Sequence, residues 1–210
     1  MDAERAPGRC TSRISGSKPS VSTSSERTIA HLKDVLPGNE WRCGDIRHTQ
    51  LPAASFDAYL SWGTFEHFEC GLGECIDEAY RILKPGGYLF VSVPFQNWRH
   101  IVRDSGSLER WDATFDPVRG ATRPQRFYQW RFTRPELKRE LEIRGFRVEL
   151  VRPSDRMEGV MRWLQWDVRI LKTGGLAFAI ARRVLARLLP ASFVSHMIVA
   201  VARKELEGTR

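Results

Sequence analysis

The chain has 210 residues, which suits one domain of ordinary size with a tail. Hydrophobic residues make up 42% of it and charged residues 28%, a balance that excludes both a membrane-embedded chain and a wholly disordered one. Lys and Arg number 33 against 25 Asp and Glu, so the net charge of +8 leaves nucleic acid, anionic lipid and acidic substrates as candidate partners.

Residues 1–25 hold seven serines, three arginines and one lysine, with few large apolar side chains. Such a stretch buries too little apolar surface to offset the entropy lost on ordering, so we expect a disordered tail outside the fold. The Arg and Ser content also fits a transit peptide, which Asp2 and Glu4 disfavour.

Regular structure starts at Ser25, which can cap a helix with apolar residues at helical spacing up to Leu36 and a Pro-Gly end. A short strand at 40–43 and a buried strand at 56–62 follow. Apolar residues at i, i+3, i+4 and i+7 over 76–83 then predict a helix with one core face.

A Lys-Pro-Gly-Gly turn at 84–87 ends that helix and reverses the chain. The strand that follows, at 88–93, is the clearest of the sequence. The periodic pattern is lost over 94–132, a stretch rich in Arg, Trp and Phe that predicts an irregular insertion or lid. It resumes in a capping box at 133–136, where Thr-Arg-Pro-Glu opens a helix that Gly145 ends.

The last third of the sequence completes the alternation of strands and helices. A strand at 146–151 precedes a basic amphipathic helical region at 157–189, broken at Gly174-Gly175, and 196–202 is the last strand. Strands separated by helices imply an α/β fold, a Rossmann-like and mostly parallel sheet with helices on both faces.

The cysteines and the missing targeting signals both bear on the compartment. The four cysteines, at positions 10, 43, 70 and 75, form no Cys-x-x-Cys pair and have no histidines at zinc-finger spacing. They predict reduced thiols. No apolar run of signal-peptide length occurs in residues 1–28, and three arginines interrupt the apolar stretch 176–189. The sequence therefore predicts a cytoplasmic protein.

Three segments in fixed order carry a family resemblance. They are Trp-Arg-Cys-Gly-Asp-Ile-Arg at 41–47, Ser-Phe-Asp at 55–57 leading into Ser-Trp-Gly-Thr-Phe-Glu-His-Phe at 61–68, and Arg-Ile-Leu-Lys-Pro-Gly-Gly at 81–87. Together they resemble the class I S-adenosylmethionine-dependent methyltransferases of the type 11 group, over about residues 25–152. The resemblance implies S-adenosyl-L-methionine as cofactor, a small-molecule methyl acceptor and a partial methyltransferase domain at 26–204, with a short tail at 205–210.

The resemblance also implies cofactor-binding residues beyond the carboxyl ends of the strands, where ligands of parallel sheets sit. Asp45 would accept a hydrogen bond from the adenine amino group, and the Ile46 backbone N–H would donate to the ring. The backbone of Trp62 and Gly63 would line the methionine part. The residues by themselves also fit a solvated turn aspartate and a glycine that serves a bend.

The acceptor would lie beside Glu66 and His67. Methyl transfer from a sulfonium requires a base only when the acceptor carries a proton, and His67 suits that role by its ordinary pKa. The other interpretation is a histidine that orients its loop. Trp98, Trp111 and Tyr128 are expected to shape the acceptor pocket together with Glu66. Relatives that hold a metal have an upstream glutamate where this chain has Gly63, so no metal is expected.

The cofactor half of the family pattern is incomplete in this sequence. Only Gly8 and Gly16 precede Ser25, with no glycine-rich loop, and Ser22-Thr23-Ser24 stands where an acid would hold the ribose. In the family's strand order, 3-2-1-4-5-7-6, the strand at 40–43 would then lack a neighbour and the strand at 56–62 would have an unpaired edge. Residues 18–23 could supply one strand. We therefore expect missing or degenerate N-terminal strands and impaired cofactor binding.

The basic surface suggests an alternative, a non-catalytic remnant that serves as a basic interaction module on RNA or an anionic membrane. Within 169–189, residues 176, 180, 184 and 188 form an apolar stripe that either lies on an anionic membrane or packs against the domain. Nucleic acid is disfavoured, because Trp-Gly-Thr-Phe at 62–65 replaces the Asn/Asp-Pro-Pro-aromatic motif of enzymes that methylate base amino groups. The arginines and aromatics of 94–132 fit base stacking and a lid equally well.

Overall fold

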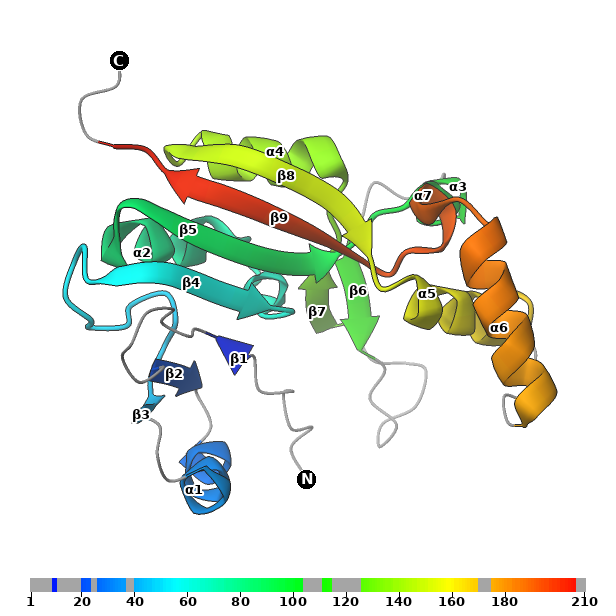
Figure 1. Cartoon of the computed structure of the whole chain (residues 1–210), viewed down its shortest axis with the longest axis horizontal. Helices are drawn as coiled ribbons and strands as arrows, with labels where there is room; N and C mark the ends of the chain where they lie inside the picture. Colours follow the sequence, from blue (N-terminus) through cyan, green and yellow to red (C-terminus); the bar gives the residue numbers. More distant parts are fainter. Residues whose placement is uncertain are drawn as a thin grey trace.

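A seven-stranded sheet in the order β3-β2-β1-β4-β5-β9-β8 forms the centre of the computed structural model (Figure 1). The structure describes residues 9–10, 20–23, 26–36, 40–103, 111–114, 126–169 and 175–206. The strands of the sheet are β1 (Arg9–Cys10), β2 (Ser20–Thr23), β3 (Glu40–Cys43), β4 (Phe56–Trp62), β5 (Leu83–Pro94), β8 (Phe146–Ser154) and β9 (Met197–Lys204).

The directions of the strands confirm the Rossmann-like α/β class and show a mixed sheet. The β2–β3 and β4–β5 pairs are parallel. The pairs that β1 makes with β2 and β4, and that β9 makes with β5 and β8, are antiparallel. Strands β2, β3, β4 and β5 therefore run in the same direction, and their carboxyl ends meet at one edge of the sheet.

The expectation that β3 lacks a neighbour is wrong, whereas the edge of β4 that faces β1 is paired only at its end. β2 pairs with β3 over four residues, and β1 pairs with the end of β4, at Ser61 and Trp62. Backbone pairing requires no apolar side chain, so these short polar strands carry no periodic signal. They are degenerate all the same: β1 is two residues long and runs antiparallel to β4.

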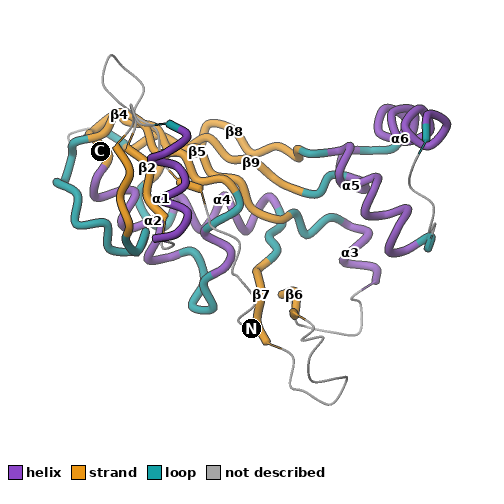
Figure 2. The backbone as a smooth tube through the Cα atoms, turned by 90° about the horizontal axis from the view of Figure 1, so that it is seen from below, coloured by secondary structure: helices purple, strands orange, loops and turns teal. Residues whose placement is uncertain are grey.

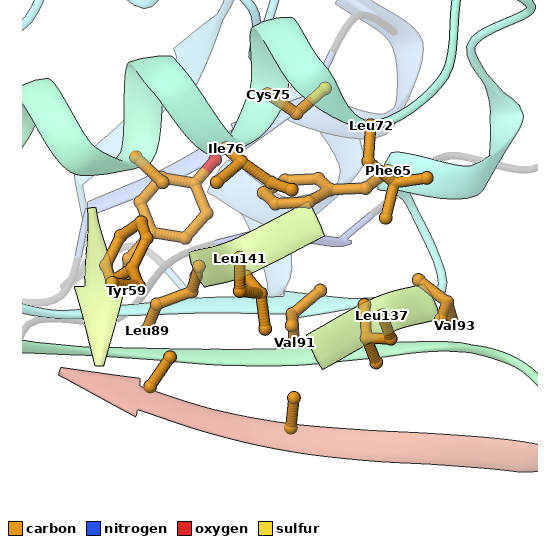
Figure 3. Packing of buried hydrophobic residues seen from close by; sticks show 14 of the residues in the cluster. Tyr59, Phe65, Leu72, Cys75, Ile76, Leu89, Val91, Val93, Leu137 and Leu141 are labelled. Atoms are coloured by element: carbon orange, nitrogen blue, oxygen red, sulfur yellow. The ribbon is translucent and has the colours of Figure 1, made fainter. Parts of the chain in front are cut away.

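The main hydrophobic core lies between the sheet and two helices, α2 (Gly73–Ile82) and α4 (Arg134–Glu142), which cover the same face of the sheet (Figures 1 and 2). Alternation along β5 turns Leu89 and Val91 to this face, where they meet Ile76 of α2 and Leu141 of α4 (Figure 3). α1 (Glu26–Val35) packs beside β2 and β3.

The capping box predicted before α4 is confirmed. The Glu136 backbone N–H donates to the Thr133 hydroxyl oxygen, and the Glu136 carboxylate accepts from the Thr133 backbone N–H at 2.9 Å. Gly145, with φ +85°, ends the helix region in the left-handed conformation that glycine adopts without strain.

The predicted Lys-Pro-Gly-Gly turn is a bulge inside β5. Phe56 pairs with Leu83 and Ala58 with Tyr88, so the four residues 84–87 of β5 stand opposite the single residue Asp57 of β4. An ion pair stabilises the bulge: Lys84 Nζ lies 2.7 Å from Asp57 Oδ1. The helix before it therefore ends at Ile82, and the strand begins one residue later.

The described parts of the 94–132 insertion are more regular than the sequence indicates. They include α3 (Trp98–Arg103) and a hairpin of β6 (Trp111–Thr114) and β7 (Arg126–Trp130). These elements are too short for a periodic pattern to identify. Two backbone hydrogen bonds, from Gln96 N to Phe132 O and from Phe132 N to Pro94 O, tie both ends of the insertion to the end of β5.

A second, smaller core lies beyond β8 and the start of β9, among α5 (Arg156–Arg162), the π-helical turn η2 (Trp163–Asp167), α6 (Leu176–Leu188) and α7 (Ala191–Val194) (Figure 1). We call these four elements the helical extension. These helices lie within or next to the predicted region 157–189. Gly175 precedes α6, and Gly174, the other residue of the predicted break, lies outside the described residues. In the described ranges, no helix is both long enough and apolar enough to cross a membrane.

Candidate functional site at the carboxyl edge of the sheet

The carboxyl ends of β3, β4 and β5 bring the predicted cofactor residues to one edge of the sheet. Asp45 and Ile46 follow β3, and Gly63 follows β4 directly. Ligands of parallel α/β sheets bind at this edge, because loops there vary without disturbing the core. The edge is therefore the candidate binding site.

Gly63 sits where the chain turns sharply after β4. Its φ of +64° is in the left-handed region, and its N–H donates to the carbonyl oxygen of Ser92 at 3.0 Å. A Cβ added there would make ordinary contacts, 3.5 Å from Glu66 Oε1 and 3.9 Å from Met197 Cε. The backbone conformation, not lack of space, therefore requires glycine here. Trp62, just before it, is largely exposed.

Glu66 lies in a 3₁₀ turn, η1 (Phe65–His67), and its side chain is only 1% exposed. Among the described residues, its Oε2 atom has no hydrogen-bond partner. Burial raises the pKa of Glu66 to about 8, because a charged carboxylate loses its hydration there. Glu66 is therefore a neutral acid at pH 7, packed behind Gly63. It is not presented to solvent, and its predicted role in acceptor binding stays a prediction.

His67 is held in one orientation by a neighbouring strand. Its Nδ1 atom is 2.8 Å from the backbone carbonyl oxygen of Tyr128 in β7, and the two rings meet edge to face at 5.0 Å. A carbonyl oxygen only accepts hydrogen bonds, so Nδ1 carries the proton. In the neutral ring this leaves the lone pair on Nε2. The geometry thus joins the two interpretations of His67, because an oriented histidine is also one that has a defined basic nitrogen.

Asp45 is engaged by Arg47, two residues later. The Arg47 guanidinium contacts both carboxylate oxygens, the shortest distance being 2.7 Å from Nη2 to Oδ2. These bonds hold the pKa of Asp45 below its ordinary value. The Asp45 side chain remains exposed, so the carboxylate is both fixed and accessible. Ile46 is different, because its side chain is buried in the main core and only its backbone could serve a ligand.

The sequence model described as a methyltransferase domain matches residues 14–91, from before β2 into β5. A probable S-adenosylmethionine-dependent methyltransferase of Mycolicibacterium smegmatis is 30% identical over 124 residues, which are 59% of this chain and 41% of the relative. Residues 14–91 are therefore similar to the methyltransferase domain family. The chain spans about two fifths of the length of that curated relative.

Solved structures show the same fold around this methyltransferase segment. A methyltransferase of Methanosarcina mazei superimposes with a TM-score of 0.59 at 18% identity, covering 89% of this chain and 81% of the other. One from Mesorhizobium loti gives 0.54 at 18% identity, covering 87% and 78%. The cyclase SpnF gives 0.52 at 16% identity, covering 88% and 65%, so the fold alone does not fix the reaction.

S-adenosylmethionine is the cofactor of this family. The edge fits part of it: Asp45 is accessible to a donor such as the adenine amino group, and Gly63 allows close approach of the backbone. The two glycines at positions 8 and 16 lie outside the described residues. β2 ends at Thr23, and the first acidic residue after it is Glu26, exposed in the first turn of α1.

The aromatic residues predicted for the acceptor pocket lie in different surroundings. Tyr128 is partly exposed and contacts His67, so the structure brings these two together. Trp98, on α3, packs on Phe193 of α7 with ring centroids 4.8 Å apart. Trp111 lies in β6, opposite Trp130 of β7.

Sequence reasoning missed a buried polar cluster just beyond β5. Arg131 Nε donates to Gln96 Oε1 at 2.7 Å, and Asn97 Nδ2 donates to the backbone oxygen of Ser195 at 3.0 Å. All four residues are buried. Their position offered a signal, because Gln96 and Asn97 are polar residues directly after a buried strand. In the described part of the chain, no group of His, Cys, Asp or Glu could hold a metal ion.

Proposed function

We propose that the chain is an S-adenosylmethionine-dependent methyltransferase that acts on a small-molecule acceptor, with impaired cofactor binding. The observation that carries the proposal is the fixed imidazole of His67, at the carboxyl edge of a segment that is similar to the methyltransferase domain family. Asp45, the Ile46 backbone, Trp62 and Gly63 would hold the cofactor along that edge.

The residues of this chain divide the work in a simple way. When bound, the cofactor supplies an activated methyl group. The acceptor's oxygen or nitrogen gains a methyl group and loses its proton, which Nε2 of His67 accepts. The Tyr128 carbonyl, which binds Nδ1–H, stabilises the imidazolium ion that forms. Glu66 is a positioning residue, because its buried carboxyl packs behind Gly63 and lies in the same turn as His67.

Two features of the cofactor side support the proposal that binding is impaired. β1 has two residues and runs antiparallel to β4, so it does not end at the carboxyl edge as β2 to β5 do. Where β2 ends, serine and threonine stand in place of an acid. Each missing charged hydrogen bond to the ribose or methionine part lowers the affinity by roughly tenfold or more.

Titration calorimetry with S-adenosylmethionine on the full chain tests the cofactor site. We expect a dissociation constant above ~10 μM, and a further increase of roughly tenfold in Asp45→Ala, because that variant loses a fixed acceptor. Asp34→Ala, on the exposed surface of α1, is the matched control and should bind as the parent does. Micromolar binding by the parent would contradict impairment, and equal binding by Asp45→Ala would contradict the assigned site.

Replacing His67 with Gln tests the base. Initial rates of methyl transfer from labelled cofactor to small hydroxyl and amine acceptors should fall by ~10²-fold or more. His31→Gln, on the exposed side of α1, should keep the rate of the parent. A His67→Gln rate within twofold of the parent would show that His67 only orients its loop.

A further inference from the structure

Helix α6 packs on the other elements of the helical extension through one of its sides. Phe178, Leu185 and Leu189 are partly buried against this second core, and Ala186 is fully buried in it. Arg182 lies on the same side, with Nη1 3.4 Å from Met161 Sδ. This side accounts for the attachment of α6 to the rest of the molecule.

The opposite side of α6 is apolar as well, and it is exposed. It carries Leu176, Ile180, Val184 and Leu188, whose exposed fractions are 76%, 51%, 46% and 75%. Their spacing of four residues places them in one stripe along the helix. The expectation that this stripe packs against the domain is therefore wrong for the described residues. Helix α6 is thus apolar on two sides but buries only one of them. The exposed apolar side is available to bind a partner.

The positive charge around the stripe indicates what kind of partner it fits. Residues 168–204 contain no Asp or Glu. Arg183 and Arg187 are exposed and one helical turn apart, next to Ile180 and Val184 of the stripe. An apolar stripe with arginines along its flank is complementary to a surface that has a negatively charged outer layer and an apolar layer beneath it. A second copy of α6 is a poor match, because a symmetric contact through the stripe would bring these arginines together across the interface.

We propose that α6 binds the surface of a bilayer that contains anionic lipids. Leu176, Ile180, Val184 and Leu188 enter the boundary between headgroups and acyl chains, while Arg183 and Arg187 contact lipid phosphates. The 13 residues of α6 span about 20 Å, less than the ~30 Å hydrocarbon core, so the helix lies along the membrane and does not cross it. The stripe and its two arginines share no residue with the candidate methyltransferase site.

Co-sedimentation of the full chain with vesicles tests the proposal. We expect the chain to pellet with vesicles of phosphatidylglycerol and phosphatidylcholine, and at least tenfold less with phosphatidylcholine alone. The Arg183→Gln/Arg187→Gln variant should lose about thirtyfold in partition coefficient on anionic vesicles. The Ile180→Ser/Leu188→Ser variant should lose more than tenfold, because less apolar surface enters the bilayer.

Matched controls change equally exposed residues elsewhere: Ile143→Ser, after α4, and Arg147→Glu, in β8. Both should bind anionic vesicles as the parent does. Equal binding to both kinds of vesicle, or unchanged binding by the two α6 variants, overturns the proposal. A dimer in sedimentation equilibrium that Ile180→Ser/Leu188→Ser converts to a monomer also overturns it, as does salt-sensitive binding to RNA without binding to vesicles. Circular dichroism and thermal unfolding establish that each variant is folded.

Discussion

Replacing Glu66 with Gln should stabilise the folded protein by an amount that grows between pH 4.5 and pH 8. The folded protein keeps the proton on Glu66 up to about pH 8, whereas the unfolded chain releases it above the ordinary pKa of 4.5. As the pH rises through this window, ionisation therefore favours the unfolded chain, and the free energy of unfolding falls. Below pH 4.5 the group is protonated in both states and contributes no pH dependence. At pH 7 the loss amounts to about 3 kcal/mol.

Urea unfolding of the parent and of Glu66→Gln at several pH values measures this effect. The glutamine has the size of the acid but cannot ionise, so the difference between the two unfolding free energies should change by several kcal/mol across the window. Glu69→Gln is the control, because Glu69 is only three residues away but exposed. Its curve should run parallel to that of the parent. Parallel curves for Glu66→Gln as well would show that the Glu66 carboxyl is hydrated.

Gly159→Ala should lower the free energy of unfolding by about 3 kcal/mol, a value at the upper end for overpacking. Gly159 lies in α5, where it faces the chain between α7 and β9. A Cβ added to it would overlap the carbonyl oxygen of Val194, and would lie 2.7 Å from the Val194 carbonyl carbon and 2.9 Å from the His196 nitrogen. These are backbone atoms, so α5 must move away from α7. Alanine's better helix propensity, worth up to ~1 kcal/mol, offsets only part of that cost.

Gly73→Ala is the matched control for this prediction. Gly73, the first residue of α2, is also in a crowded place, but an added Cβ would meet the guanidinium of Arg144, the flexible end of a side chain. Arg144 can shift, so the variant should unfold within 1 kcal/mol of the parent. If thermal unfolding places Gly159→Ala within that same range, the contact between α5 and α7 is loose in solution.

Elements with strong local signals were predictable from the sequence. The strand at Phe56–Trp62 has the predicted bounds, and the capping box at Thr133 fixed the start of α4 because both of its hydrogen bonds are local. β2 falls within residues 18–23, which the sequence offered as one possible strand. β1 and the β6–β7 hairpin were not predictable, because short strands depend on pairing with distant partners. Nor could the sequence show which side of α6 is buried, since both sides are apolar.

The same distinction applies to the site. Strand order brings Asp45 and Gly63 to one edge, and that much follows from the sequence pattern. The bond from His67 to the Tyr128 carbonyl joins residues 61 positions apart, through a backbone atom that no residue type identifies. The burial of Glu66 is likewise a property of packing. Sequence alone names the titratable groups here, and packing determines their protonation.

The position of β9 has a consequence for the growing chain. β9 is the last strand in sequence, yet it lies between β5 and β8 and pairs with both. During synthesis, β5 and β8 leave the ribosome first, and each presents an unpaired edge until Met197–Lys204 is available. Translation that stops before residue 197 would therefore leave two incomplete sheets that are prone to aggregate.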